Sequence, residues 1–341
     1  MKLAIGHRIH EGPWGGGNRF AQSLAQAMDK AGHKVVFDLN DIDIDIILLT
    51  DPRPRSPSVS FSAGAILRYL IFKNKNALVV HRINECDERK GTRHMNLALV
   101  RANWCADFTV FVGSWLKDLQ IWKENLRTPH STILNGADPS VFNSSGLIPW
   151  SGDGPLRLVT HHWGGNWMKG FDIYQKIDQM LVTPEWRGKL TFTYIGNLPK
   201  GFKFQNTCYV PPLNGSELAE ELKKHHAYVT ASINEPGGNH QNEAGACGLP
   251  LLYRESGCLP EYCDGFGISF HEKNFDIKLN ELYINYEKLI QIMKTWPHLS
   301  PNTCKQYLQL FENLLLNKQK IILKRDFWLS KSLMIRNLFL Y

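Results

Sequence analysis

Two acidic residues, Glu235 and Glu243, stand on either side of a glycine break in the segment YVTASINEPGGNHQNEAGACGLPLLY, which spans Tyr228 to Tyr253. The pattern predicts a strand, a loop that carries Glu235, a helix with Glu243 in its first turns, and a second strand. Both carboxylates can then face one crevice. A helix start reached through glycines presents free backbone N–H groups that suit phosphate, and carboxylates beside it accept hydrogen bonds from sugar hydroxyls. Phosphate with a polyol indicates a nucleotide sugar. From the spacing alone, two solvated acids favoured by the helix macrodipole explain the pattern equally well.

The sixteen residues EPGGNHQNEAGACGLP resemble the E-x7-E signature of the family-4 retaining glycosyltransferases, which have the GT-B fold. The resemblance implies that Glu243 holds the ribose diol of the donor and that Glu235 contacts the donor sugar. It also implies that Gly238 and Asn239 lie against the diphosphate and sugar through backbone amides, with His240 at the donor site. His240 begins the pair that replaces the family's usual apolar residue, which leaves the sugar specificity open.

The loop that precedes the helix of Lys169, HHWGGNWMKG, resembles the family's phosphate clamp of one arginine and one lysine. Lys169 matches the lysine, whereas His161, His162 and Trp163 stand where the arginine is expected. A protonated His162 or Arg19 can take the missing place, because a cation there stabilises the leaving diphosphate. The alternative is a solvated lysine in the first turn of a helix, which the helix macrodipole disfavours.

A glycine-rich loop near the N-terminus follows the first apolar run, Lys2 to Gly6, and leads into the helical stretch NRFAQSLAQAMDKAG. The G-x-G-x-x-G spacing of dinucleotide-binding folds is missing. The segment GPWGGGNRF instead resembles the loop that covers the donor diphosphate in GT-B enzymes, which implies that Gly16 and Gly17 bind the donor. Arg19 can add a cation there or lie at the surface of the first helical turn.

A lone histidine, His81, ends the apolar run in ALVVHRINE and therefore lies at the carboxyl end of a predicted strand. Several family-4 enzymes carry a histidine there that contacts the donor sugar. The resemblance thus implies His81, Lys169 and Glu235 as catalytic residues. No Asp or Glu base stands out in the N-terminal part, which fits a mechanism in which the departing diphosphate deprotonates the acceptor.

The elements that must position these residues alternate between short apolar runs and helical or loop segments, which predicts parallel, doubly wound sheets with ligands at the carboxyl ends of the strands. With the resemblance, the expected fold class is α/β, GT-B, with two Rossmann-like domains facing a central cleft. The Gly-, Ser- and Pro-rich stretch NSSGLIPWSGDGP is the predicted linker. We expect an acceptor-side domain over residues 1–145, a nucleotide-sugar-binding domain over 146–315, and a basic helix or tail over 316–341.

Three aspartates, Asp41, Asp43 and Asp45, have the D-x-D spacing of the metal site in the other large class of glycosyltransferases. Their alternation with isoleucine, directly before an apolar run, instead predicts the start of a strand. We expect no metal and no cofactor besides the UDP- or GDP-sugar donor.

The composition of the 341 residues, 43% hydrophobic and 21% charged, is that of a soluble globular protein. No signal peptide and no spanning segment are expected, and seven cysteines without a C-x-x-C pair predict reduced thiols in the cytoplasm. The net charge of +7 can attract an anionic donor or a membrane, and no nucleic-acid signature is present. The basic, aromatic end of the chain either lies on anionic lipid or forms a helix packed on the protein.

The resemblance over nearly the whole chain implies transfer of a hexose, with retention, from a UDP- or GDP-sugar to a hydroxyl of a glycan or lipid-linked glycan. Two alternatives remain open. One is a non-catalytic GT-B-like subunit, which the missing clamp arginine favours. The other is an NAD-dependent oxidoreductase, which shares the alternating architecture but needs a glycine fingerprint that this chain lacks.

Overall fold

The computed structural model describes residues 1–12 and 15–325. The chain forms two compact units, one of Met1–Leu134 with the chain from Pro301 onward, and one of Asn135–Ser300. Each unit contains a six-stranded sheet in which all paired strands are parallel. The predicted α/β class with two doubly wound sheets is therefore confirmed.

The first unit has the strand order β2-β1-β3-β4-β5-β6. Its strands are β1 (Lys2–Ile5), β2 (Lys34–Val36), β3 (Ile46–Leu49), β4 (Leu78–Ile83), β5 (Phe108–Phe111) and β6 (His130–Thr132). Its helices are α1 (Gly16–Lys30), α2 (Ala63–Phe72), α3 (Met95–Asn103), α4 (Ser114–Lys117), α5 (Gln120–Asn125), α12 (Ser300–Leu316) and α13 (Lys318–Leu323).

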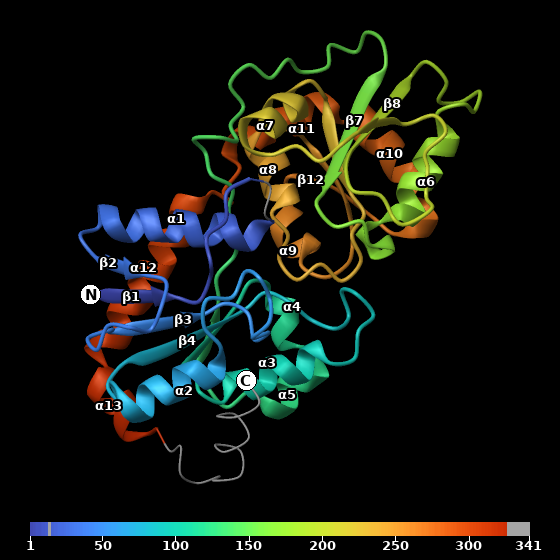
Figure 1. Cartoon of the computed structure of the whole chain (residues 1–341). Helices are drawn as coiled ribbons and strands as arrows, with labels where there is room; N and C mark the ends of the chain where they lie inside the picture. Colours follow the sequence, from blue (N-terminus) through green and yellow to red (C-terminus); the bar gives the residue numbers. More distant parts are fainter. Residues whose placement is uncertain (13–14, 326–341) are drawn as a thin grey trace. The chain divides into compact units, whose positions relative to one another are not determined.

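Helices cover both faces of this sheet because successive strand side chains point to opposite sides. Leu3 and Ile5 of β1 belong to the core beneath α1 and α12, whereas Ala4 between them belongs to the core beneath α2. Figure 1 shows α1 and α12 on one side of the sheet and α2 on the other. Burial on both faces explains why the strands read as continuous apolar runs in the sequence.

The division of the chain differs from the predicted boundaries at 145 and 315. The first unit ends at Leu134, and α12 belongs to it rather than to the second unit. The reason is apolar packing: Tyr307 and Phe311 of α12 are buried in the core of α1 and β1. The predicted basic tail, 316–341, is described only as far as Arg325, and residues 326–341 lie outside the described part.

The end of the described chain is tied to the first unit by polar contacts. The Arg325 guanidinium donates to both carboxylate oxygens of Asp107, at 2.9 and 2.5 Å, and to the backbone oxygens of Lys75 and Ala77. The side chains of Arg325 and Asp107 are 7% and 5% exposed. Up to Arg325, the C-terminal segment is therefore packed on the protein, which is one of the two predicted alternatives.

The second unit has the order β12-β11-β10-β7-β8-β9. Its strands are β7 (Leu156–His162), β8 (Leu190–Gly196), β9 (Cys208–Val210), β10 (Ala227–Thr230), β11 (Leu251–Arg254) and β12 (Gly267–Phe270). Its helices are α6 (Phe171–Met180), α7 (Gly215–Lys223), α8 (His240–Ala246), α9 (Leu259–Cys263), α10 (Phe275–Ile284) and α11 (Tyr286–Ile292), with the short 3-10 turns η1 (Trp167–Lys169), η2 (Glu272–Asn274) and η3 (Met293–Thr295).

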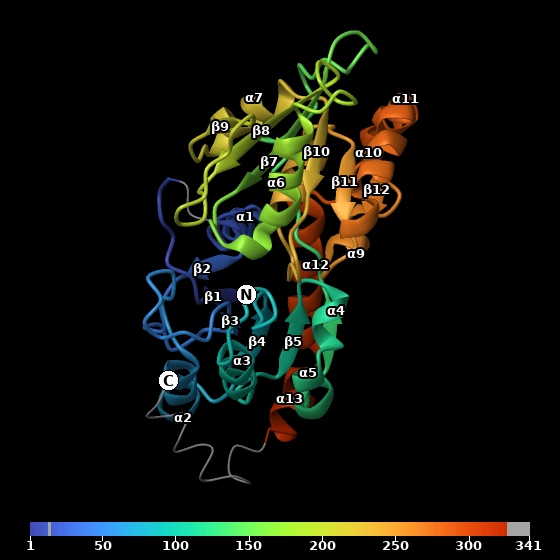
Figure 2. The same ribbon diagram turned by 90° about the vertical axis from the view of Figure 1, so that its right-hand side faces the viewer.

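The core of this unit lies between the sheet and α6, α10 and α11. Figure 2 shows α10 and α11 beside β11 and β12, and in Figure 1 α8 and α9 lie on the opposite side of the sheet from α6 and α10. The helix α8 is thus held on a rigid sheet directly after the loop that follows β10.

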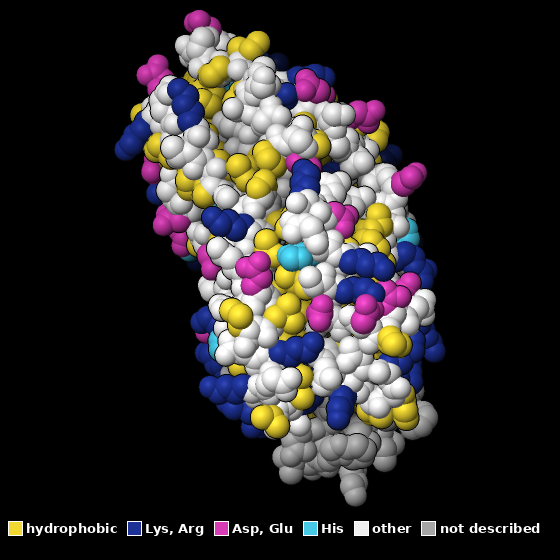
Figure 3. Space-filling model, turned by 90° about the vertical axis from the view of Figure 1, so that its left-hand side faces the viewer, with side chains coloured by type: hydrophobic (Ala, Val, Ile, Leu, Met, Phe, Trp, Pro, Cys, Tyr) yellow, Lys and Arg dark blue, Asp and Glu magenta, His cyan; other side chains and the backbone are white. Residues whose placement is uncertain are grey.

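In Figure 3 lysine and arginine side chains are scattered over the face shown, with acidic side chains between them. Asp41 and Asp43, two of the three aspartates before β3, both form ion pairs with Lys2, and Asp45 accepts from the Lys2 backbone N–H. The start of a strand predicted there is confirmed, because β3 begins at Ile46. In the described part of the chain, no helix is both long and apolar enough to span a bilayer.

Candidate functional site

The carboxyl ends of β7 and β10 form the topological switch point of the second sheet. The two strands are paired neighbours, and the strands that follow each of them extend the sheet in opposite directions. Ligands of doubly wound sheets bind where the order reverses in this way. His161 and His162 end β7, Thr230 ends β10, and the loop after β10 carries Glu235. The predicted donor-binding residues of the second unit therefore lie at or directly after the strand ends where doubly wound sheets bind ligands.

The loop that carries Glu235 is held by its neighbours. Asn234 has a positive φ of 52°, and its backbone N–H donates to the Ser256 hydroxyl at 2.9 Å. The Glu235 backbone oxygen accepts from Cys258 N–H at 2.9 Å, and a side chain at Gly257 would approach Glu235 N to 2.4 Å. Asn135 Nδ2 donates to the Gly237 oxygen at 2.7 Å. The loop conformation is thus fixed from several sides.

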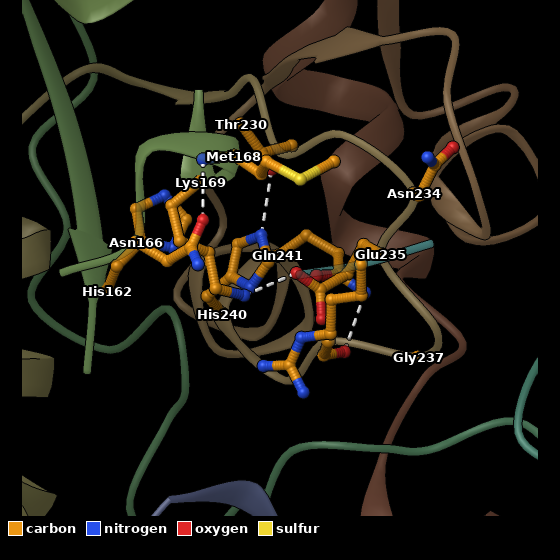
Figure 4. A network of polar contacts seen from close by, with 12 residues as sticks. His162, Asn166, Met168, Lys169, Thr230, Asn234, Glu235, Gly237, His240 and Gln241 are labelled. Carbon is orange, nitrogen blue, oxygen red and sulfur yellow. Dashed lines mark hydrogen bonds and ion pairs between the residues drawn. The ribbon is translucent and has the colours of Figure 1, made fainter. Parts of the chain in front are cut away.

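A buried ion pair joins the loop after β7 to the loop after β10. Lys169 Nζ lies 2.5 Å from Glu235 Oε2, and the two side chains are 11% and 4% exposed. Lys169 reaches this place because η1 ends at Gly170, whose φ of 101° suits glycine and whose missing Cβ lets the backbone approach Ala231. Figure 4 shows the Lys169–Glu235 contact with His240 close by. The predicted clamp lysine and the first glutamate of the motif are therefore brought together.

The second glutamate of the motif has a histidine partner. Glu243 lies in the first turn of α8, and its Oε2 is 2.8 Å from His161 Nε2. Both side chains are buried. The Tyr228 hydroxyl lies 3.1 Å from His161 N and 3.2 Å from His161 O, so that it can accept from one and donate to the other. The predicted helical placement of Glu243 is confirmed.

His162 and His240 are both buried within the same site. The Tyr174 hydroxyl accepts from Thr160 Oγ1 and from Ala231 N, which leaves its proton for His162 Nε2 at 2.6 Å. His162 therefore faces an internal hydroxyl at this nitrogen, and that hydroxyl stays protonated because burial raises the pKa of Tyr174.

His240 is neutral, since burial lowers the pKa of its imidazole to about 3. Its Nε2 lies 2.8 Å from Thr230 Oγ1, and its charge environment includes Lys169, Glu235, His161 and Glu243. His240 thus lies beside both glutamates of the motif.

The glycine turn before α8 is lined by amide side chains. Gln241 Nε2 donates to the Gly238 oxygen at 2.7 Å, and a Cβ at Gly238 would approach the His240 ring to 2.6 Å. The backbone oxygen of Asn239 accepts a hydrogen bond from the backbone N–H of Glu243. Within residues 1–12 and 15–325, the side-chain oxygens of Asn239 and Gln241 are buried and lack a hydrogen-bond partner. Buried acceptors without partners are unusual in a finished core, and they suit a place where a ligand donates hydrogen bonds.

The remaining predicted site residues belong to the first unit. Gly16 and Gly17 begin α1, and Arg19 is half-buried on that helix. The residues at 13 and 14, in the predicted diphosphate loop, lie outside the described part.

The predicted position of His81 at a strand end is wrong, because β4 continues to Ile83. His81 is fully buried, with Nδ1 3.0 Å from Asn103 Oδ1, and burial lowers the pKa of its imidazole to about 4. It is an internal residue of the sheet.

Known structures resemble this chain in fold at low sequence identity. The sucrose-phosphate synthase of Thermosynechococcus elongatus matches with a TM-score of 0.64 and 12% identity, over 92% of this chain and 99% of that chain. HepE of Anabaena, in complex with UDP and glucose, matches with a TM-score of 0.66 and 11% identity over the same shares. The α,α-trehalose-phosphate synthase (UDP-forming) of Burkholderia xenovorans, in complex with glucose-6-phosphate, has a TM-score of 0.59 and 11% identity, over 88% of this chain and 78% of that chain.

This chain has the GT-B fold. The predicted fold class is thereby confirmed. No protein-family model matches the chain, and no curated protein matches it in sequence.

The sequence did not indicate one member of the site, His161, as the partner of Glu243. Its signal was present: a His-His pair at the end of a predicted strand is polar in a place where the strand is otherwise apolar. Of the two histidines, the sequence indicates only His162 as a source of charge, because periodicity does not show which of two neighbouring side chains faces the next helix.

Proposed function

We propose that this protein is a glycosyltransferase that moves a hexose from a UDP- or GDP-sugar to a hydroxyl of a glycan or lipid-linked glycan, with retention of configuration. The observation that carries the proposal is the pair of buried glutamates at the switch point of the second sheet, each beside a basic side chain. A nucleotide sugar offers ribose and sugar hydroxyls to the carboxylates and a diphosphate to the lysine. The GT-B structures with UDP or sugar bound support this ligand class.

The second unit can divide the donor between its two pairs. Glu243, in the first turn of α8, is suited to the ribose diol, since a carboxylate accepts two hydroxyl hydrogen bonds. Glu235 is suited to the hydroxyls of the sugar. Lys169, with its ammonium at 2.5 Å from Glu235, is suited to the diphosphate between them. The sugar contact of His81 stays a prediction from the resemblance; Asn103 holds its Nδ1, and in the described part of the chain its buried Nε2 has no hydrogen-bond partner.

Lys169 would act mainly on the departing diphosphate. Charge develops on that group as the glycosidic bond breaks, and a fixed ammonium in a buried place stabilises it more than water does. Its hydrogen bond to Glu235 positions the ammonium before the donor arrives. In this proposal the diphosphate itself takes the proton of the acceptor hydroxyl, and no further base and no metal takes part.

Incubation of the purified protein with a panel of UDP- and GDP-sugars, with release of free UDP or GDP as the measured signal, tests the proposal. We expect one base and one sugar to give nucleotide release that rises when a hydroxyl acceptor is added. The anomeric configuration of the product, measured by NMR, tests retention. Binding of a nucleotide without release from any donor would instead identify a non-catalytic GT-B subunit, the alternative that the missing clamp arginine favours.

A further inference from the structure

His161 is a buried side chain of the site to which the proposed function gives no role, and it contacts one of the two glutamates. It stands in β7, while its partner Glu243 stands in α8, and Nε2 to Oε2 is 2.8 Å. The two side chains are 9% and 7% exposed. A hydrogen bond to a buried carboxylate is stronger than one between neutral groups, and it fixes the direction of the oxygen that accepts it. His161 is thus built to hold the carboxylate of Glu243.

The imidazole of His161 has little freedom to move away. The Tyr228 hydroxyl contacts both the backbone N–H and the backbone oxygen of His161, at 3.1 and 3.2 Å. The Tyr228 ring packs edge-on against the imidazole at 5.5 Å between centroids, and the His240 ring does so at 6.3 Å. The Nε2–H group of His161 is therefore held in one position before any ligand binds.

His225, also buried in the second unit, has different polar partners and serves as a comparison. His225 uses both ring nitrogens: Nδ1 lies 2.9 Å from the Glu221 oxygen and Nε2 lies 2.8 Å from Thr193 Oγ1. His161 uses Nε2, while its Nδ1 is buried without a hydrogen-bond partner in the described part of the chain. Among the described residues, the unpartnered Nδ1 leaves the His161 ring with one polar side-chain contact, the contact of Nε2 with Glu243.

We propose that His161 is a positioning residue for the nucleotide end of the donor, acting through Glu243. Its Nε2–H holds one carboxylate oxygen of Glu243, so that the carboxylate is already oriented for the ribose diol when the nucleotide arrives. Orientation before binding increases affinity, because the ligand then does not have to order the side chain. This inference rests on the proposed function and adds to it a determinant of nucleotide affinity.

The role predicts a specific kinetic signature. The ribose is remote from the bond that breaks, so Glu243 holds it equally in the ground state and in the transition state. Loss of such uniform binding raises KM and leaves kcat unchanged. His161 therefore differs from Lys169, whose loss is expected to lower kcat.

The test compares two variants. His161→Phe keeps a ring but removes the N–H group that donates a hydrogen bond to Glu243, and His161→Gln has an amide N–H that can donate this hydrogen bond again. We measure the Kd of UDP and of GDP by calorimetry, and the KM and kcat of the preferred donor. For His161→Phe we expect a Kd and KM roughly tenfold higher, which corresponds to about 1.4 kcal/mol, with kcat within about twofold of the wild type. His161→Gln should recover most of the affinity. His225→Phe is the matched control and should leave the Kd unchanged.

A double-mutant cycle tests whether His161 acts through Glu243. Glu243→Gln alone and Glu243→Gln combined with His161→Phe should bind UDP equally weakly. Once the carboxylate of Glu243 is gone, the hydrogen bond from His161 no longer affects how the ribose is bound. Should His161→Phe not fold, His161→Asn replaces it, since the shorter amide does not reach the position of Nε2.

Full additivity in the cycle, or wild-type affinity in His161→Phe, would overturn the inference while leaving the proposed function in place. A wild-type protein that binds neither UDP nor GDP overturns both.

Discussion

Replacing Lys169 by methionine should destabilise the second unit, because it leaves the Glu235 carboxylate buried without its ammonium partner. The two side chains are 11% and 4% exposed, so water cannot take over the role of the lysine. Removing one partner of a buried ion pair costs about 3–5 kcal/mol. For a unit of this size that loss lowers the melting temperature by about 6–20 °C, at roughly 2–4 °C for each kcal/mol. Methionine fills most of the lysine volume, so the loss reports on charge rather than on a cavity.

Replacing both partners should separate stability from function. Lys169→Met combined with Glu235→Leu removes both buried charges, and such replacements are often neutral or stabilising. We expect the melting temperature of the double variant to return to within a few degrees of the wild-type value. Transfer should stay low in both variants, by roughly 10²–10³ in kcat for the loss of one fixed donor to the leaving group.

Thermal unfolding followed by near-UV circular dichroism, together with nucleotide release, measures both effects. Lys176→Met is the matched control: its pair with Asp276 has the same distance of 2.5 Å, but the side chains are 33% and 50% exposed. An exposed pair contributes about 0–1 kcal/mol, so this variant should melt close to the wild type. A double variant as unstable as Lys169→Met alone would refute the assignment of the lost stability to the broken Lys169–Glu235 ion pair.

Glu243→Ala should raise the Kd of UDP or GDP roughly tenfold or more, since hydrogen bonds to a charged group contribute about 1.5–3 kcal/mol each; calorimetry measures it. Arg325→Ala should destabilise the first unit by about 3–5 kcal/mol through the buried Asp107, seen as a lower denaturant midpoint with unchanged nucleotide affinity. Acid should destabilise the protein as the pH falls from about 6.5 toward 3, because burial lowers the pKa of His81 to about 4 and of His240 to about 3, and the unfolded chain then binds protons that the fold excludes; melting temperatures across this range test it. Chelation with EDTA should leave transfer unchanged, and strict dependence on Mn²⁺ or Mg²⁺ would direct attention to the aspartates before β3.

Much of the second unit could be predicted because its signals are local. The break at Pro236 and the glycines after it separate strand, loop and helix within a few residues, and the structure places Glu235 on the loop and Glu243 in the first turn of α8 accordingly. The apolar runs of both sheets were equally clear, since strands buried on both faces have no polar alternation to confuse the assignment.

The errors concern contacts between segments distant in sequence. Nothing local in α12 shows that its apolar face packs beside α1, so it was assigned to the unit that precedes it in the chain. The apolar run before His81 predicts a strand that ends there, yet Asn103 from α3 supplies a partner for His81 within the sheet, and β4 continues to Ile83. The pairing of His161 with Glu243 likewise joins residues 82 positions apart.

The return of α12 to the first sheet has a consequence for how the protein is made. A ribosome delivers the strands of the first sheet early, but the helix that completes one of its faces emerges only after all of residues 135–300. Until then the apolar surface that Tyr307 and Phe311 will cover is exposed to solvent. By that stage all strands of the second sheet have been synthesised, so the second unit can fold. The first unit can therefore complete its core only after the second unit has been synthesised, and a pause in translation before α12 leaves that apolar surface exposed and prone to aggregation.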